Sequence, residues 1–189
     1  MAERERRAAS AGRGRFVPRA QVLSASDVRR ALARIAHEVL ERNRGLDELA
    51  VIGLQTGGAS LARRLAAALE EIGQGTVPLG SLDVAWYRDD LRLRPVVPAA
   101  PSEIPFDVTG RVVILFDDVL YTGRTVRAAL DALSDLGRPK AVQLAVMIDR
   151  GHRELPIRPD YVGKNLPTRR DELVDVTDEG VWLGEVSAR

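Results

Sequence analysis

The chain contains no cysteine among its 189 residues. This absence excludes disulfide bonds, thiolate zinc sites and a thiol nucleophile, and it is compatible with a reducing cytoplasm. Apolar runs are also short, and none approaches the roughly 18 residues that a membrane helix needs. The charged N-terminus has no apolar segment behind it, as a secretory signal would require. The sequence therefore predicts a cytoplasmic protein without a membrane partner.

Lysine and aromatic residues are scarce. Only Lys140 and Lys164 are lysine among 28 basic residues, and the rest are arginines, whose planar guanidinium groups suit phosphate. The net charge is only +1, so the total charge does not demand a polyanionic partner. Aromatic residues make up 4% of the chain. Base stacking is therefore not expected to be the main mode of any nucleic-acid binding.

Apolar strands alternate with amphipathic helices along the chain. Strands are expected at 49–54, 77–87, 112–116 and 141–148, and the first helix is expected to start at Ser24 or Ser26. This alternation predicts an α/β fold with a mainly parallel sheet flanked by helices. The strand ends after Leu54, Phe116 and Ile148 are expected along one edge of the sheet, where such folds bind ligands.

Two segments fall outside this alternation. Residues 1–18 are interpreted as a disordered basic tail, which leaves 19–189 as a single domain. The proline-rich segment 88–110 shows little periodicity. A loop of this length in a compact domain is usually a mobile lid or a linker, and here a lid is favoured.

The most informative stretch is VVILFDDVLYTGRT, residues 112–125. Its continuous apolar run indicates a strand buried on both faces. Neighbouring carboxylates at Asp117 and Asp118 suit a ligand with two hydroxyls. The following Thr122–Thr125 turn opens a helix, whose N-terminal amides form an anion site. Together these features describe a ribose 5-phosphate site, whereas the alternative is a helix cap beside two solvated acids.

This stretch resembles the signature of type I phosphoribosyltransferases, which bind 5-phosphoribosyl-1-pyrophosphate (PRPP). The stretches SASDVRRALARIAHEVLERN, LDVAWYRDDL and DRGHRELPIRPDYVGKNLPT are similar to the PyrR family, and the likeness spans about 21–170. The resemblance implies a type I phosphoribosyltransferase fold with a flexible lid and a small hood. It also implies uracil phosphoribosyltransferase activity, giving UMP and pyrophosphate, and transcription attenuation of pyrimidine operons through uridine-nucleotide-dependent binding to leader mRNA.

The resemblance further implies a role for each motif. Asp117 and Asp118 would hold the ribose 2- and 3-hydroxyls. The 5-phosphate loop would comprise Thr122, Gly123, Arg124 and Thr125, and the pyrophosphate loop Thr56, Gly57 and Gly58. The catalytic lid would begin with Arg88, Asp89 and Asp90. The hood, at about 149–170, would bind uracil through Asp149, Arg150, Val162 and Lys164.

Cofactor and partners follow from the same resemblance. Mg²⁺ would accompany PRPP, held mainly by substrate oxygens and water, so no protein metal cluster is expected. UMP and UTP would be co-regulators, and the protein would form a homodimer or homotetramer. Leader mRNA would contact His152, Arg153, Arg29, Arg30 and Arg34, although the three helical arginines have a solvated helix face as their alternative.

Two positions depart from the family pattern. Gly57 stands where the pyrophosphate loop usually has arginine, and Ala85 stands where a threonine usually precedes the lid. Both changes remove a polar group from the expected substrate site. Two alternatives therefore stay open: an RNA-binding regulator with weak or lost transferase activity, and a salvage phosphoribosyltransferase that binds no RNA.

Overall fold

The computed structural model describes residues 16–84 and 101–187. The elements in chain order are β1 (Phe16–Ser24), α2 (Ala25–Asn43), β2 (Leu49–Leu54), α3 (Gly57–Gly73), β3 (Leu79–Leu82), β4 (Val112–Leu120), α4 (Arg124–Leu136), β5 (Ala141–Asp149), β6 (Tyr161–Asn165), β7 (Leu173–Thr177) and β8 (Gly180–Val186). No helix in this part of the chain is long and apolar enough to cross a membrane.

A parallel sheet in the order β3-β2-β4-β5-β6 forms the centre of the molecule. Its register aligns Leu120 at the end of β4 with Asp149 at the end of β5. Asp149 is in turn aligned with Asn165 at the end of β6. The carboxyl ends of these strands therefore lie along one edge, which confirms the expected α/β fold and the convergence of its strand ends. The expected end after Phe116 was wrong, because β4 continues to Leu120 through pairing with β5.

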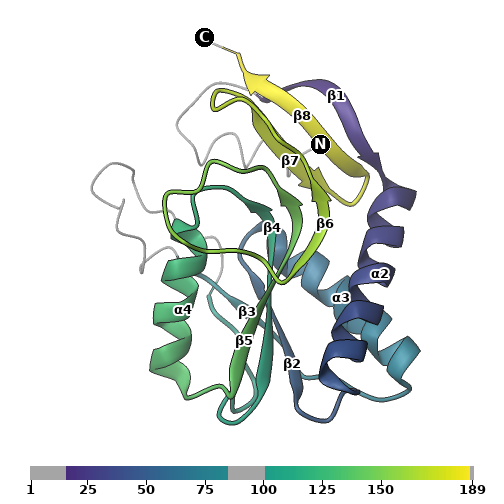
Figure 1. Ribbon diagram of the computed structural model, residues 1–189, viewed down its shortest axis with the longest axis vertical. Helices are drawn as coiled ribbons and strands as arrows, with labels where there is room; N and C mark the ends of the chain where they lie inside the picture. The colour runs from purple at the N-terminus through teal and green to yellow at the C-terminus, as the bar shows by residue number, and fades with distance from the viewer. Residues whose placement is uncertain (1–15, 85–100, 188–189) are drawn as a thin grey trace.

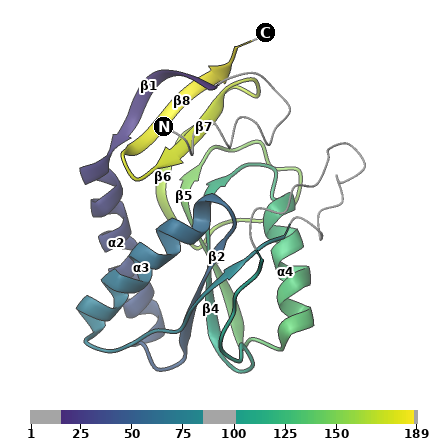
Figure 2. The ribbon, with the colours of Figure 1, turned by 180° about the vertical axis from the view of Figure 1, so that it is seen from behind.

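Helices cover both faces of this sheet, with α2 and α3 on one side and α4 on the other (Figures 1 and 2). Alternate residues of β4 face the two helix layers. Ile114 and Phe116 pack with α2 and α3, whereas Val113 and Leu115 pack with α4. All four side chains are fully buried. Burial on both faces explains why the strand is continuously apolar instead of alternating.

A second, antiparallel sheet in the order β1-β8-β7 lies above the carboxyl edge of the parallel sheet (Figure 1). It corrects the expected tail of residues 1–18, because Phe16 and Pro18 are paired with β8. The rest of that expected tail lies outside the described residues. Pro18 obscured the strand in the sequence, yet proline is tolerated in an edge strand such as β1.

The expected hood and lid also need new boundaries. Residues 161–165 of the expected hood form β6, the edge strand of the parallel sheet. Residues 101–110 of the expected lid are packed on the domain: Glu103 exchanges two backbone hydrogen bonds of 2.8 Å with Ser81, and Val108 is buried. The remainder of that lid, 88–100, lies outside the described residues.

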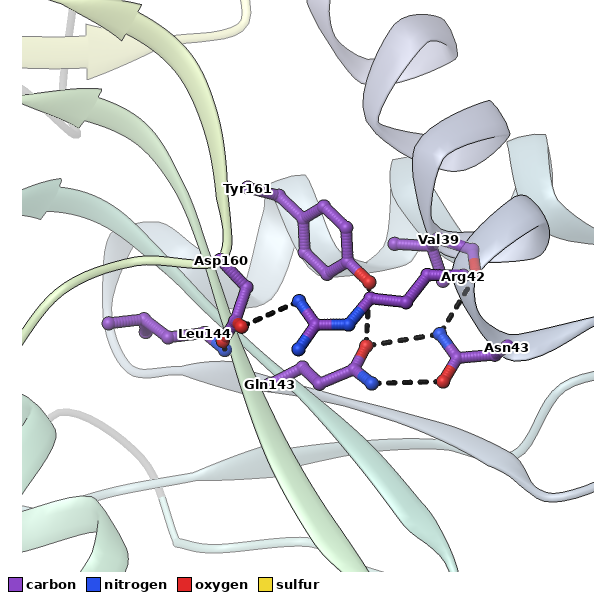
Figure 3. A network of polar contacts seen from close by, with 7 residues as sticks. All are labelled: Val39, Arg42, Asn43, Gln143, Leu144, Asp160 and Tyr161. Carbon is purple, nitrogen blue, oxygen red and sulfur yellow. Dashed lines mark hydrogen bonds and ion pairs between the residues drawn. The ribbon is translucent and has the colours of Figure 1, made fainter.

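A polar network attaches α2 to the start of β5 and β6 (Figure 3). Asn43 and Gln143 exchange amide hydrogen bonds of 3.0 and 2.9 Å, and the Tyr161 hydroxyl donates to Gln143 at 2.7 Å. Arg42 pairs with Asp160 at 2.6 Å. Burial raises the pKa of Tyr161, which keeps its hydroxyl a donor. The network therefore fixes the helix against the edge of the parallel sheet.

The start of α2 agrees with the sequence. Ser24 Oγ accepts a hydrogen bond from the Asp27 amide at 3.2 Å, and the Asp27 carboxylate accepts one from the Ser24 amide at 2.8 Å. This reciprocal capping box satisfies amides that the first turn leaves without partners. Ser24 is therefore the N-cap, and Ser26 lies inside the helix.

Candidate functional site

The two acids of the motif lie within the last part of β4. Asp117 is 7% exposed, and Asp118 is half-buried. One oxygen of Asp117 accepts from the Asp118 amide at 2.9 Å, and one oxygen of Asp118 accepts from the Val119 amide at 2.8 Å. These backbone bonds hold both carboxylates at the carboxyl edge of the sheet.

The turn after β4 forms a pocket of about 120 Å³. It is lined by Asp117, Val119, Leu120, Tyr121, Thr122, Gly123, Thr125 and Val126. Gly123 has φ of 93° and directly precedes α4, so it adopts a conformation that favours glycine. The first amides of α4 consequently adjoin the pocket, which has the form of an anion site at a helix N-terminus.

The predicted pyrophosphate loop lies beside these acids. Thr56 precedes α3 and is exposed, and Gly58 is buried within the first turn of that helix. A Cβ atom at Gly58 would lie 2.4 Å from the Phe116 carbonyl oxygen and 3.1 Å from the Asp117 Cα. Only glycine permits this approach, which brings the two predicted loops together at neighbouring strand ends.

Gly57 provides a direct test of the departure from the family pattern. It is the first residue of α3, a helical backbone position that residues other than glycine also adopt. A guanidinium beside pyrophosphate would add about 1–3 kcal/mol of charge-assisted bonding. Gly57→Arg is therefore expected to raise kcat/KM for PRPP about fivefold or more in steady-state assays. A well-folded variant with wild-type kinetics would show that the loop acts through its backbone alone.

The four predicted uracil-binding residues occupy different environments. Asp149 accepts from the Gly151 amide at 3.0 Å and pairs with Arg153 at 2.5 Å. Arg150 is buried, with its guanidinium 4.3 Å from the centre of the Tyr121 ring. Burial lowers the pKa of that guanidinium. Val162 is half-buried and Lys164 is exposed on β6. The structure thus directs the Asp149 and Arg150 side chains into the protein.

The predicted RNA-binding residues do not form one open patch. Arg29 and Arg30 are exposed on α2, and Arg30 pairs with Asp27. Arg34 donates to the carbonyls of Val162 and Gly163 at 2.8 and 2.9 Å, which ties it to the free edge of β6.

His152 and Arg153 lie in the connection from β5 to β6. The His152 ring is 2.6 Å from the Thr168 carbonyl oxygen. The Arg153 side chain is only 21% exposed and makes several contacts within the protein. The two groups of predicted RNA contacts are thus on separate elements, and Arg34 and Arg153 both have internal partners.

Some of the site was not identified from sequence, and some lies beyond the described residues. Val119, Leu120 and Tyr121 line the pocket, and their only signal was their position inside the motif. Arg88, Asp89 and Asp90 lie outside the described residues, and so does Ala85.

The described residues contain carboxylates that could contact Mg²⁺ but no cluster of metal ligands. Among the described residues, no group of three or more histidine, aspartate or glutamate side chains could hold a metal ion. Mg²⁺ commonly binds through one or two carboxylates, several waters and substrate phosphates. Asp117, which lines the pocket, fits that mode, in which the substrate provides most of the ligands.

Comparison with known proteins connects this fold and site to a class. A family model described as the phosphoribosyl transferase domain matches residues 19–178. A hypoxanthine phosphoribosyltransferase structure from Staphylococcus aureus has a TM-score of 0.67 and 16% identity, covering 90% of this chain and 93% of its own. The enzyme from Trypanosoma cruzi gives 0.66 and 19%, covering 83% and 85%. The fold and the site define a phosphoribosyltransferase domain.

Curated relatives identify the family within this class. "Bifunctional protein PyrR" of Roseiflexus sp. is 62% identical over 157 residues, 82% of this chain and 85% of the relative, and that of Deinococcus radiodurans is 59% identical over 162 residues, 84% and 87%. The chain belongs to the PyrR family of bifunctional proteins. It is a uracil phosphoribosyltransferase and a regulator of pyrimidine operon expression, which confirms the function expected from the sequence.

Proposed function

We propose that the pocket at the end of β4 binds the ribose 5-phosphate part of PRPP. The observation that carries this assignment is the buried strand β4, which holds Asp117 and Asp118 in its last part and leads into a glycine turn lined by threonines. The 5-phosphate accepts from the amides of the loop and the start of α4. The two carboxylates accept hydrogen bonds from the 2- and 3-hydroxyls, and the pyrophosphate lies against the Thr56–Gly58 turn.

The reaction transfers the phosphoribosyl group to uracil. Uracil N1 forms a bond to ribose C1 and loses its proton to solvent. The bond from C1 to pyrophosphate breaks, and its electron pair leaves with the pyrophosphate oxygen. Positive charge develops on the ribose ring as pyrophosphate departs, so the carboxylates of Asp117 and Asp118 stabilise the sugar that they orient. Mg²⁺ bound with PRPP supplies charge neutralisation for the leaving pyrophosphate. Arg88, Asp89 and Asp90 remain the proposed catalytic lid, which excludes water when it closes.

The base is held at the carboxyl ends of β5 and β6. Lys164 is aligned with Ile148 across these strands, and Val162 lies two residues before Lys164 in β6. Asp149 and Arg150 shape this side through their backbone and internal contacts. The hood is expected to favour uracil over a larger purine base. The structurally similar hypoxanthine enzymes share only their fold with this chain.

The regulatory activity uses an arginine-bearing surface for leader mRNA, with uridine nucleotides in the same pocket as co-regulators. Arg29 and Arg30 are exposed, and phosphate contacts from such side chains make RNA binding weaken as salt rises. His152 belongs to the neighbouring hood. The protein acts in the cytoplasm as a homodimer or homotetramer.

The base preference tests the assignment directly. Pyrophosphate release is measured with uracil, orotate and hypoxanthine in parallel, at one PRPP concentration with Mg²⁺. Uracil is expected to be used at least about tenfold more efficiently than hypoxanthine, because a site built for one set of polar groups penalises a base that leaves them unpaired. Equal or better turnover with a purine would overturn the assignment.

A further inference from the structure

Arg153 directs its guanidinium into the protein from the connection between β5 and β6. Its Nη1 donates to the Tyr121 carbonyl at 2.7 Å, and its Nε donates to the Ile157 carbonyl at 3.0 Å. Its Nη2 pairs with Asp149 at 2.5 Å. Longer contacts of 3.3 and 3.5 Å join Nη1 to the carbonyls of Gly151 and Leu120. These contacts use all three nitrogen atoms of the fork.

The acceptors include the residues that lead into the 5-phosphate loop. The neighbouring backbone makes the same connection: the Arg150 amide donates to the Leu120 carbonyl at 3.1 Å. The amides of Glu154 and Leu155 donate to the Thr122 carbonyl at 3.0 and 3.2 Å. The carbonyls of residues 120, 121 and 122 are therefore all bonded by the segment 150–155.

This arrangement has a consequence for anion binding. A loop that presents successive amides to a phosphate must turn its carbonyl groups elsewhere, and these require donors. Arginine supplies several donors in a rigid plane, whereas lysine supplies one ammonium on a flexible stem. The guanidinium of Arg153 is thus suited to hold several backbone carbonyls at once, and with them the direction of the loop amides.

We propose that Arg153 is a positioning residue for the 5-phosphate loop, which acts on PRPP and nucleotides through the carbonyls behind that loop. This inference rests on the proposed assignment of the loop to the 5-phosphate. On this inference, Arg153 acts selectively on phosphate recognition. Any effect of Arg153 on RNA binding then depends on the bound nucleotide.

The test uses the full chain with Arg153→Lys, which keeps the charge but not the planar fork. The matched control is Arg158→Lys, because Arg158 is exposed in the same connection and makes no hydrogen bond or ion pair with the described residues. KM for PRPP is measured at saturating uracil, and KM for uracil at saturating PRPP. For Arg153→Lys, KM for PRPP is expected to rise at least about tenfold and KM for uracil to stay within about twofold. The control is expected to match the wild type.

Three results would overturn the inference: both KM values unchanged, both raised alike together with a lower melting temperature, or a loss of leader-hairpin affinity without nucleotide while the kinetics stay normal. The last result would indicate a direct RNA contact. Arg153→Gln, which keeps a planar amide donor, replaces the lysine variant if that one melts below the assay temperature, and the same criteria apply. A wild-type protein that does not use PRPP would instead refute the proposed function.

Discussion

Removing the charge from both motif acids, with Asp117→Asn and Asp118→Asn together, is expected to lower kcat/KM for PRPP about a hundredfold or more. Each ribose hydroxyl would lose a charged acceptor, and a hydrogen bond to a charged group contributes about 1.5–3 kcal/mol. Two such losses exceed about 2.8 kcal/mol, the equivalent of two factors of ten. Steady-state kinetics with varied PRPP at saturating uracil measures the effect.

The fold is expected to survive this double substitution. The oxygens of Asp117 and Asp118 that accept the backbone amides at 2.9 and 2.8 Å have counterparts in asparagine. The control is Asp131→Asn with Asp135→Asn, which removes two exposed carboxylates from α4. This control is expected to keep wild-type kinetics. If the motif variant also did so while folded, these acids would have no role in holding the ribose.

Gly58→Ala is expected to lower kcat/KM for PRPP by a similar factor and to reduce the melting temperature. The new methyl group would overlap the Phe116 carbonyl oxygen at 2.4 Å and approach the Asp117 Cα at 3.1 Å. Both neighbours are backbone atoms of a buried strand, so the start of α3 must move instead. Overpacking of this kind costs about 1–3 kcal/mol, and a displacement of about 1 Å at a site can cost about a hundredfold in rate.

Gly73→Ala is the matched control for this substitution, at the far end of the same helix. The three atoms nearest to its new methyl group belong to the Leu46 side chain, the first at 2.8 Å, and that side chain can turn aside. Thermal unfolding and PRPP kinetics are measured for both variants. Unaltered kinetics in Gly58→Ala would mean that the first turn of α3 lies too far from the substrate to influence it.

The sequence determined the features whose physical cause is local. The apolar run 112–116 required burial on both faces, and β4 is buried in that way between α2, α3 and α4. Ser24 and Asp27 stand at capping-box spacing, and α2 begins there. The signature around Asp117 identified the class of protein, because its strand, acids and glycine turn are contiguous.

Only the tertiary structure decided the features whose partners are distant in sequence. Phe16–Ser24 is a strand because β8, near the other end of the chain, supplies its hydrogen bonds. Glu103 leaves the expected lid because Ser81 pairs with it. Arg153 turns inward because its acceptors are mainly backbone carbonyls, which every sequence contains and no motif reveals. Local propensity and contiguous motifs depend on residues that are close in sequence. These contacts, in contrast, exist only after folding has brought separate segments together.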